Sequence, residues 1–204
     1  MTHSGKKINW VHIHDVMPTE LTPAAKHKRM QLFDLFDPNK NNYLSLAEVD
    51  KGVQDVLHLQ ELFEVKPVLM MAFKLARSAN QGGGPLKLEA KKNRQTKMGN
   101  NYIEKSEFRL LLVYLRQYLE LWAMFSEIDV DGDRRVQMAE FQKAVPIIES
   151  WGTKIPDVAA EFRSIDKDGG GMILFGEFAE WALNKNLDLP DDDDFDDSTL
   201  HAKK

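Results

Sequence analysis

Apolar residues at helical spacing alternate with polar, turn-rich segments over most of the chain. Thr22 before Pro23 has the form of a helix N-cap with proline in the first turn. An apolar-periodic run follows, and the polar segment DPNKNNYLSLAE (37–48) separates it from a second such run. The two runs predict two helices, with apolar positions at Met30, Phe33 and Phe36 and then at Val49, Val53, Val56 and Leu57. Helix, polar loop and helix form the first predicted unit.

The same pattern recurs in the second half of the chain. Periodic runs flank the loops DVDGDRRVQMAE (129–140) and DKDGGGMILFGE (166–177), whose first residues lie 37 positions apart. This regular spacing indicates an internal repeat. A fourth, less obvious unit contains the loop TKMGNNYIEKSE (96–107). The stretch from Glu107 to Ile128 has no glycine or proline, so we expect one long helix that joins two lobes.

The loops match the twelve-residue pattern of an EF-hand, a helix-loop-helix calcium site. Calcium takes six to eight oxygen ligands, which the loop supplies from positions 1, 3, 5, 7, 9 and 12, with position 7 acting through its carbonyl. Position 6 needs a backbone with positive φ, which favours glycine. Position 8 is apolar, because paired loops meet there in a short antiparallel ladder. The predicted fold is therefore all-α, with four EF-hand units in two paired lobes.

The third loop has the strongest set of ligands. Its four carboxylates stand at positions 1, 3, 5 and 12, with a carbonyl at position 7, and the predicted ligands are Asp129, Asp131, Asp133, Arg135 and Glu140. Position 6 is Arg134, where a left-handed conformation costs roughly 1–2 kcal/mol. Gly132 at position 4 offers part of the required freedom. We rank this loop first and expect a strained turn in it.

The first and fourth loops are less complete. The first has oxygen at every ligand position but only two carboxylates, and its predicted ligands are Asp37, Asn39, Asn41, Tyr43 through its carbonyl, and Glu48. Fewer charges predict weaker binding. The fourth has a suitable turn at Gly171 but lacks side-chain ligands at positions 5 and 9, and its predicted ligands are Asp166, Asp168, Met172 through its carbonyl, and Glu177. We expect it to bind with help from the third loop.

The second loop is expected to hold no ion, which leaves two to three calcium ions for the chain. It has Thr96 and Met98 at positions 1 and 3, and a thioether is a poor calcium ligand. Ile103 at position 8 explains why the unit is kept, because it can pair with Leu44 of the first loop. By the same logic Val136 is predicted to pair with Ile173.

Charge and composition divide the chain further. The net charge of −5 lies in residues 187–204, where seven aspartates face two lysines, so the rest is neutral. We expect this acidic tail to be disordered. A basic, glycine-rich insert is predicted at about 80–97, within an N-terminal lobe of residues 21–117. A C-terminal lobe of residues 118–186 and an N-terminal extension of residues 1–20 complete the predicted organisation. No run approaches the roughly 18 apolar residues of a membrane span, and the chain has no cysteine.

Four stretches carry a resemblance to a known family: RMQLFDLFDPN, EFRLLLVYLRQYLELWAMFSEID, EFQKAVPIIESWG and EFRSIDKDGGG. Over about residues 22–186 the chain is similar to the calflagins, the flagellar calcium-binding proteins of trypanosomatids. The resemblance implies a calcium sensor with four EF-hands, of which the two C-terminal ones bind calcium. We expect a cytoplasmic location, and the resemblance adds a flagellum or cilium as an alternative. Calflagins begin with a glycine and a cysteine that become acylated, whereas this chain has Met1, Thr2 and His3, so we expect no lipid anchor.

Several functions share this pattern. The leading hypothesis is a calcium sensor that exposes an apolar surface to a protein target, with Met124, Met138, Met172, Trp151 and Trp181 as candidates for that surface. A calcium buffer without a target, a structural component of a flagellum and a coelenterazine-type photoprotein are the alternatives. No nucleophile and base are arranged for catalysis, so we expect no enzyme. We also expect no nucleic-acid partner, and at most weak contact of the basic insert with anionic lipid.

Overall fold

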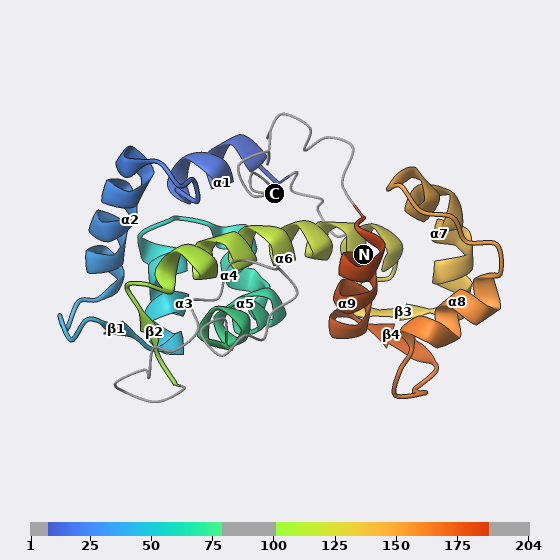
Figure 1. Ribbon diagram of the computed structural model, residues 1–204. Coiled ribbons are helices and arrows are strands. Elements are labelled where there is room, and N and C mark those ends of the chain that lie inside the picture. The colour runs from blue at the N-terminus through green and yellow to red at the C-terminus, as the bar shows by residue number, and fades with distance from the viewer. Residues whose placement is uncertain (1–7, 79–100, 188–204) are drawn as a thin grey trace. The chain divides into compact units, whose positions relative to one another are not determined.

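The computed structural model describes residues 8–78 and 101–187 of the chain (Figure 1). The predicted basic insert at about 80–97, positions 1 to 5 of the second loop and the acidic tail beyond Leu187 lie outside the described residues. The described parts fall into two compact units, which meet in sequence between Leu119 and Glu120. We call Asn9–Leu119 the N-terminal unit and the part from Glu120 to Leu187 the C-terminal unit.

Helices form most of the N-terminal unit, and its two strands are very short. In chain order the elements are α1 (Trp10–Val16), α2 (Pro23–Phe36), β1 (Tyr43–Leu44), α3 (Leu46–Asp55), α4 (Gln60–Glu64), α5 (Lys66–Ser78), β2 (Ile103–Glu104) and the first part of α6 (Phe108–Ile128). The predicted N-cap is present, since the Thr22 Oγ1 accepts a hydrogen bond of 3.2 Å from the Ala25 N–H. The uninterrupted run before Ile128 forms the single helix α6, as predicted.

The C-terminal unit repeats the helix-loop-helix arrangement twice. After the second part of α6 come β3 (Arg135–Gln137), α7 (Met138–Ser150), α8 (Val158–Ile165), β4 (Met172–Leu174) and α9 (Phe175–Lys185). Asp157 caps α8 by accepting from the Ala160 N–H at 2.9 Å.

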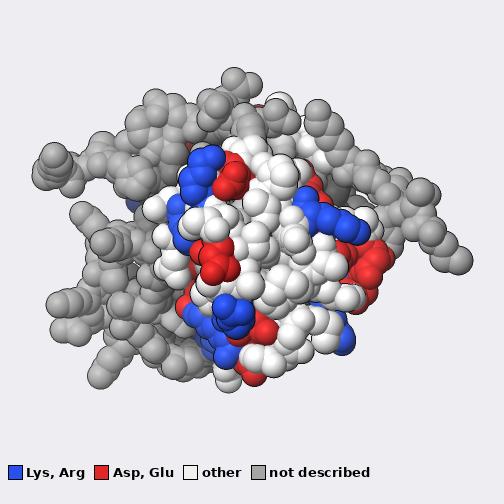
Figure 2. Space-filling model, turned by 90° about the vertical axis from the view of Figure 1, so that its right-hand side faces the viewer, with Lys and Arg blue, Asp and Glu red and all other residues white. Residues whose placement is uncertain are grey.

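On the face shown in Figure 2, acidic and basic side chains are interspersed among uncharged residues. The described residues therefore form no patch of one charge sign on this face.

The strands pair in the register that the sequence predicted. β1 and β2 are antiparallel with Leu44 opposite Ile103, and β3 and β4 are antiparallel with Val136 opposite Ile173. These four apolar residues are almost fully buried. The apolar side chain at position 8 of each loop therefore joins two hands into one core, and the predicted paired EF-hand fold is confirmed.

Three helices of the N-terminal unit were not predicted. The extension before residue 21 has no clear periodicity, yet it contains α1, which the Asn9 side chain caps at the His12 N–H. Ile13 and Met17 are buried, one helical turn apart, while Val11 is exposed. The helices α4 and α5 were also missed, although α5 carries a continuous buried face that leads toward the second loop. A helix as short as α1 has too few turns for its period to stand out.

Aromatic side chains fill the core of each unit. In the N-terminal unit Phe108 of α6 packs edge-on against Phe33 and Phe36 of α2, with ring centroids 5.3 and 5.4 Å apart. A Cβ at Gly52 of α3 would lie 2.4 Å from the Phe36 ring, so only glycine fits this approach of α3 to α2. In the C-terminal unit Phe125 and Phe178 pack at 5.6 Å.

Two arginines hold the segment after α1. Arg29 of α2 is 9% exposed, and its Nη1 donates to the carbonyl oxygens of Pro18 at 3.0 Å and Glu20 at 2.6 Å. Arg109 of α6 donates from Nε to the Thr19 carbonyl oxygen at 2.6 Å. Three consecutive carbonyl groups thus find cationic donors on two helices. This is how the N-terminal extension is joined to the first EF-hand pair.

We expect Arg29→Met to lower the free energy of unfolding by about 1–2 kcal/mol, because two carbonyl groups lose a charged donor. Urea unfolding followed by circular dichroism measures this change. Lys28→Met is the matched control, since Lys28 is exposed on the same helix, and it should change stability by less than about 0.5 kcal/mol. Equal stability of the two variants would contradict a role for Arg29 in holding the segment.

Candidate metal centres in the paired loops

The third loop turns its carboxylates inward, onto its own backbone. The Asp129 Oδ1 and Oδ2 accept from the N–H groups of Gly132 and Arg134, both at 2.9 Å. The Asp133 Oδ1 accepts from the Arg135 N–H at 2.8 Å, and the Asp131 Oδ1 accepts from the Asp133 N–H at 3.1 Å. One carboxylate oxygen from each of the three aspartates lies within 4.8 Å of the other two. The loop therefore gathers three anionic groups around one point.

Glu140 closes this loop from the other side. Its Oε2 accepts from the Gln137 N–H at 3.0 Å, and its Oε1 accepts from the Val130 N–H at 3.1 Å. The first bond holds the carboxylate at the start of α7, where the helix dipole also favours negative charge. The second bond reaches across to the beginning of the loop. Glu140 thus links the two ends of the loop in which it was predicted to be the last ligand.

The electrostatics of the third loop favour a cation. Burial raises the pKa of Asp129, and the nearby Asp133 and Glu140 carboxylates raise it further, while the backbone N–H groups of Arg134 and Gly132 lower it. Burial penalises the charged form of a carboxyl group, and neighbouring anions repel it. A cation among these oxygens would relieve both effects.

The sharp turn at position 6 has the predicted strain. Arg134 has φ of 68°, Asn42 of the first loop has 67° and Gly171 of the fourth has 75°. Position 4 also has positive φ, with a glycine in the third and fourth loops but Lys40 in the first. The positive φ at position 4 was not predicted. As a result the first loop has two non-glycine residues in the left-handed region, Lys40 at position 4 and Asn42 at position 6.

The fourth loop brings together a different set of three carboxylates. Asp166, Asp168 and Glu177 each offer an oxygen within 4.8 Å of the others. Asp166 accepts from the N–H groups of Gly170 at 3.0 Å and Gly171 at 2.9 Å. Because position 5 is Gly170, the loop has no side-chain ligand there, as predicted. Glu177 takes part in the gathered set, so this loop reaches three carboxylates without a position-5 ligand.

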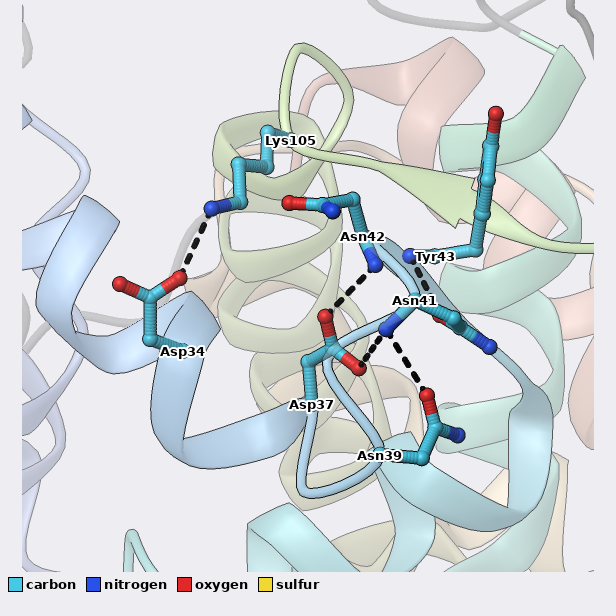
Figure 3. A network of polar contacts seen from close by, with 7 residues as sticks. All are labelled: Asp34, Asp37, Asn39, Asn41, Asn42, Tyr43 and Lys105. Carbon is cyan, nitrogen blue, oxygen red and sulfur yellow. Dashed lines mark hydrogen bonds and ion pairs between the residues drawn. The ribbon is translucent and has the colours of Figure 1, made fainter.

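The first loop has the same backbone arrangement with fewer charges (Figure 3). The Asp37 carboxylate accepts from the N–H groups of Asn41 at 3.1 Å and Asn42 at 2.8 Å, and the Asn41 Oδ1 accepts from the Tyr43 N–H at 2.8 Å. Asn39 Nδ2 lies 2.5 Å from the Glu48 Oε1 across the loop. Amide groups thus occupy positions where the third loop has carboxylates.

In the described part of the second loop, a lysine forms an ion pair with the first hand. Lys105 at position 10 lies 2.8 Å from the Asp34 carboxylate of α2 (Figure 3). Its Nζ also lies over the Phe33 ring, 5.2 Å from the centroid. Glu107 is 1% exposed, and its Oε2 accepts from the Glu104 N–H at 2.8 Å. The glutamate at position 12 therefore caps the following helix here, and Lys105 ties the loop to the first hand. No local sequence pattern indicates this ion pair, because its partners are 71 positions apart.

The donors of the third and fourth loops fit a hard cation such as Ca²⁺. Both sets consist of carboxylate oxygens, which calcium prefers to nitrogen or sulfur. The residues predicted to contribute carbonyl groups, Arg135, Met172 and Tyr43, are the first residues of β3, β4 and β1. Each of them directly follows the residue with positive φ at position 6, and it is therefore the point where the loop enters its strand.

No helix among the residues that the structure describes is long and apolar enough to cross a membrane.

Comparison with known proteins assigns the chain to a family. The FCaBP EF-hand domain matches residues 13–115. The flagellar calcium-binding protein of Trypanosoma cruzi is 39% identical over 186 residues, which cover 91% of this chain and 83% of that protein. The flagellar calcium-binding protein TB-1.7G of Trypanosoma brucei brucei is 31% identical over 198 residues, covering 95% and 81%. The chain belongs to this flagellar calcium-binding protein family, as the resemblance in its sequence suggested.

We expect Arg134→Gly to raise the free energy of unfolding of the calcium-free protein by about 0.5–1 kcal/mol. Glycine removes the strain of positive φ, and the greater freedom of the unfolded chain offsets part of this gain. Arg135→Gly is the matched control: it makes the same change one residue later, in β3, and should lower stability by about 0.5–1 kcal/mol. Urea unfolding with a chelator present compares them, and a loss of stability in both would contradict strain at Arg134.

Proposed function

We propose that this member of the flagellar calcium-binding protein family is a calcium-binding EF-hand protein that binds its tightest ions in the third and fourth loops. The observation that carries the proposal is the convergence of three carboxylates in each of these two loops. Two such sets, joined back to back through β3 and β4, form one paired unit. The names of the relatives, which are calcium-binding proteins, support the same function.

In the third loop Asp129, Asp131, Asp133 and Glu140 would hold the ion by their side chains, and Arg135 by its carbonyl group. Burial and then the nearby Asp133 and Glu140 carboxylates raise the Asp129 pKa, and the bound ion would offset both effects. In the fourth loop Asp166, Asp168 and Glu177 would act with the Met172 carbonyl. Because β3 and β4 share one ladder, ordering one loop favours the other, and we expect the two ions to bind cooperatively.

The first loop is proposed as a weaker third site, with Asp37, Asn39, Asn41, Tyr43 and Glu48 as ligands. Its two carboxylates provide less attraction than the four of the third loop, and affinity follows the charge of the ligands. The second loop is not proposed to bind an ion. Its contribution is structural, through the Leu44–Ile103 pair and the Lys105–Asp34 ion pair.

We propose a sensor in preference to a buffer. Three of the five candidates for a calcium-exposed apolar surface are buried in the C-terminal unit, where Met124 is 0% exposed, Trp151 3% and Trp181 7%. The other two, Met138 and Met172, are half-buried. Sensor EF-hands open their helix pairs on binding calcium, whereas buffers barely move. A core this rich in aromatic side chains, with Met124 among them, would give such an opening a surface for a protein target. The names of the relatives support a flagellar location for this protein.

Glu140→Gln is expected to abolish the tightest calcium-binding event, because it removes a charged ligand that also closes the loop. Glu177→Gln should weaken the second event, and Glu48→Gln should affect only the weakest. Calorimetric titration of the three variants beside the wild type measures each event separately. An unchanged isotherm for Glu140→Gln would show that the ranking of the loops is wrong.

The sensor hypothesis predicts that calcium increases exposed apolar surface. We expect saturation to raise the fluorescence of a hydrophobic dye several-fold and to shift tryptophan emission, while magnesium at the same concentration leaves both unchanged. Glu140→Gln combined with Glu177→Gln serves as the control and should remove both responses. Calcium binding without either response would identify a buffer.

A further inference from the structure

A polar contact joins the two helices of the fourth EF-hand at a distance from its loop. The Glu161 Oε1 of α8 accepts from the Trp181 Nε1 of α9 at 2.6 Å, and it lies 2.9 Å from the Lys185 Nζ of the same helix. Glu161 precedes the loop Asp166–Glu177, and both partners follow it. The contact therefore closes a bridge between the entering and the exiting helix.

This bridge is more shielded than the neighbouring ion pair between Lys167 and Glu180. The Glu161 side chain is 17% exposed and the Lys185 side chain 37%, whereas Lys167 and Glu180, which also join this loop to α9, are 53% and 58% exposed. Burial alone would raise the pKa of Glu161, but the hydrogen bonds from Lys185 and Trp181 outweigh it and lower the pKa. Exposed ion pairs contribute little to the stability of the folded state, whereas a shielded carboxylate with two hydrogen-bond donors contributes measurably to it.

The bridge also closes over the aromatic core. Trp181 packs against Phe178 at 5.8 Å and against Phe141 of α7 at 6.4 Å, and Phe141 in turn contacts Phe162 of α8 at 5.7 Å. Each of these four side chains is at most 7% exposed. An opening of α8 from α9 would expose this cluster, and it would first have to break the Glu161 contacts.

We propose that Glu161, Trp181 and Lys185 form a latch that holds the fourth hand closed and thereby sets the calcium level at which it opens. The inference rests on the proposed function and specifies its regulation. Helices that diverge from a common loop separate most at their far ends, and Glu161 and Lys185 lie several residues from the loop on either side. If calcium binds the open hand more tightly, part of its binding free energy is used to break the latch.

The latch makes a prediction that simple electrostatics does not. Glu161→Gln removes a negative charge near the site, which by itself would weaken calcium binding. Lys185→Met removes a positive charge, which by itself would strengthen it. Breaking the latch should raise calcium affinity in both variants, by roughly three- to tenfold for a contact of this strength, so that Glu161→Gln changes affinity in the direction opposite to the charge effect. The double variant should gain no more than one single variant, because both changes break the same contact.

The test is a calorimetric calcium titration of the full chain, as wild type, Glu161→Gln, Lys185→Met and the double variant. Glu180→Gln is the matched control, because it removes the same charge from an exposed pair on α9 and should leave affinity unchanged or lower it. Dye binding in chelator gives a second measurement that needs no bound ion, and both latch variants should bind more dye than the wild type. Circular dichroism establishes that each variant is folded.

The indole N–H of Trp181 reports on the latch directly. In calcium-free wild type its proton resonance, assigned with Trp181→Phe, should exchange slowly with solvent, and calcium should accelerate this exchange. Lowered affinity in Glu161→Gln, with or without a gain in Lys185→Met, would overturn the latch and leave only a charge effect. A wild type that binds no calcium would overturn the proposed function and the latch with it, so the two failures are distinguishable.

Discussion

A glutamate at position 12 of each loop is the contact on which the paired hands depend. In all four hands its carboxylate accepts from the N–H of position 9, at 2.8 Å from Ser45 and Glu104, 3.0 Å from Gln137 and 2.9 Å from Leu174. The bond caps the exiting helix, where orphan N–H groups need an acceptor. In the hands that bind an ion, the same carboxylate would also be a ligand. Because the capping role needs no ion, it accounts for the glutamate of the second hand as well.

The loops differ in charge much more than in backbone arrangement. The aspartate at position 1 accepts from position-6 N–H groups in the first, third and fourth hands, at 2.8–2.9 Å. This bond fixes the turn whose positive φ strains Asn42 and Arg134. The three loops thus share one backbone arrangement and differ in the number of carboxylates, so we expect them to differ in calcium affinity. The third and fourth loops offer most charge, and their shared ladder makes them one binding unit.

The latch in the fourth hand opposes this binding unit. The loop carboxylates gain from a cation, while Glu161 and its partners favour the closed core of Phe141, Phe162 and Trp181. A sensor needs such a balance, because a hand that opened without resistance would expose its apolar surface at every calcium level. The first loop, in the N-terminal unit, has two carboxylates at its ligand positions, fewer than the third and fourth loops.

The sequence by itself determined the loops and their pairing. The strained turn at Arg134 follows from a pattern within one twelve-residue loop, where neighbours in sequence are neighbours in space. The register of Val136 with Ile173 follows from the recurrence of that pattern 37 residues later. Tertiary structure alone decided which distant groups meet. Arg109 reaches the Thr19 carbonyl 90 positions away, Lys105 reaches Asp34 and Trp181 reaches Glu161, and together they dock α1, join the second loop to the first hand and close the fourth. No local pattern specifies these contacts, because each depends on how helices pack around the aromatic cores.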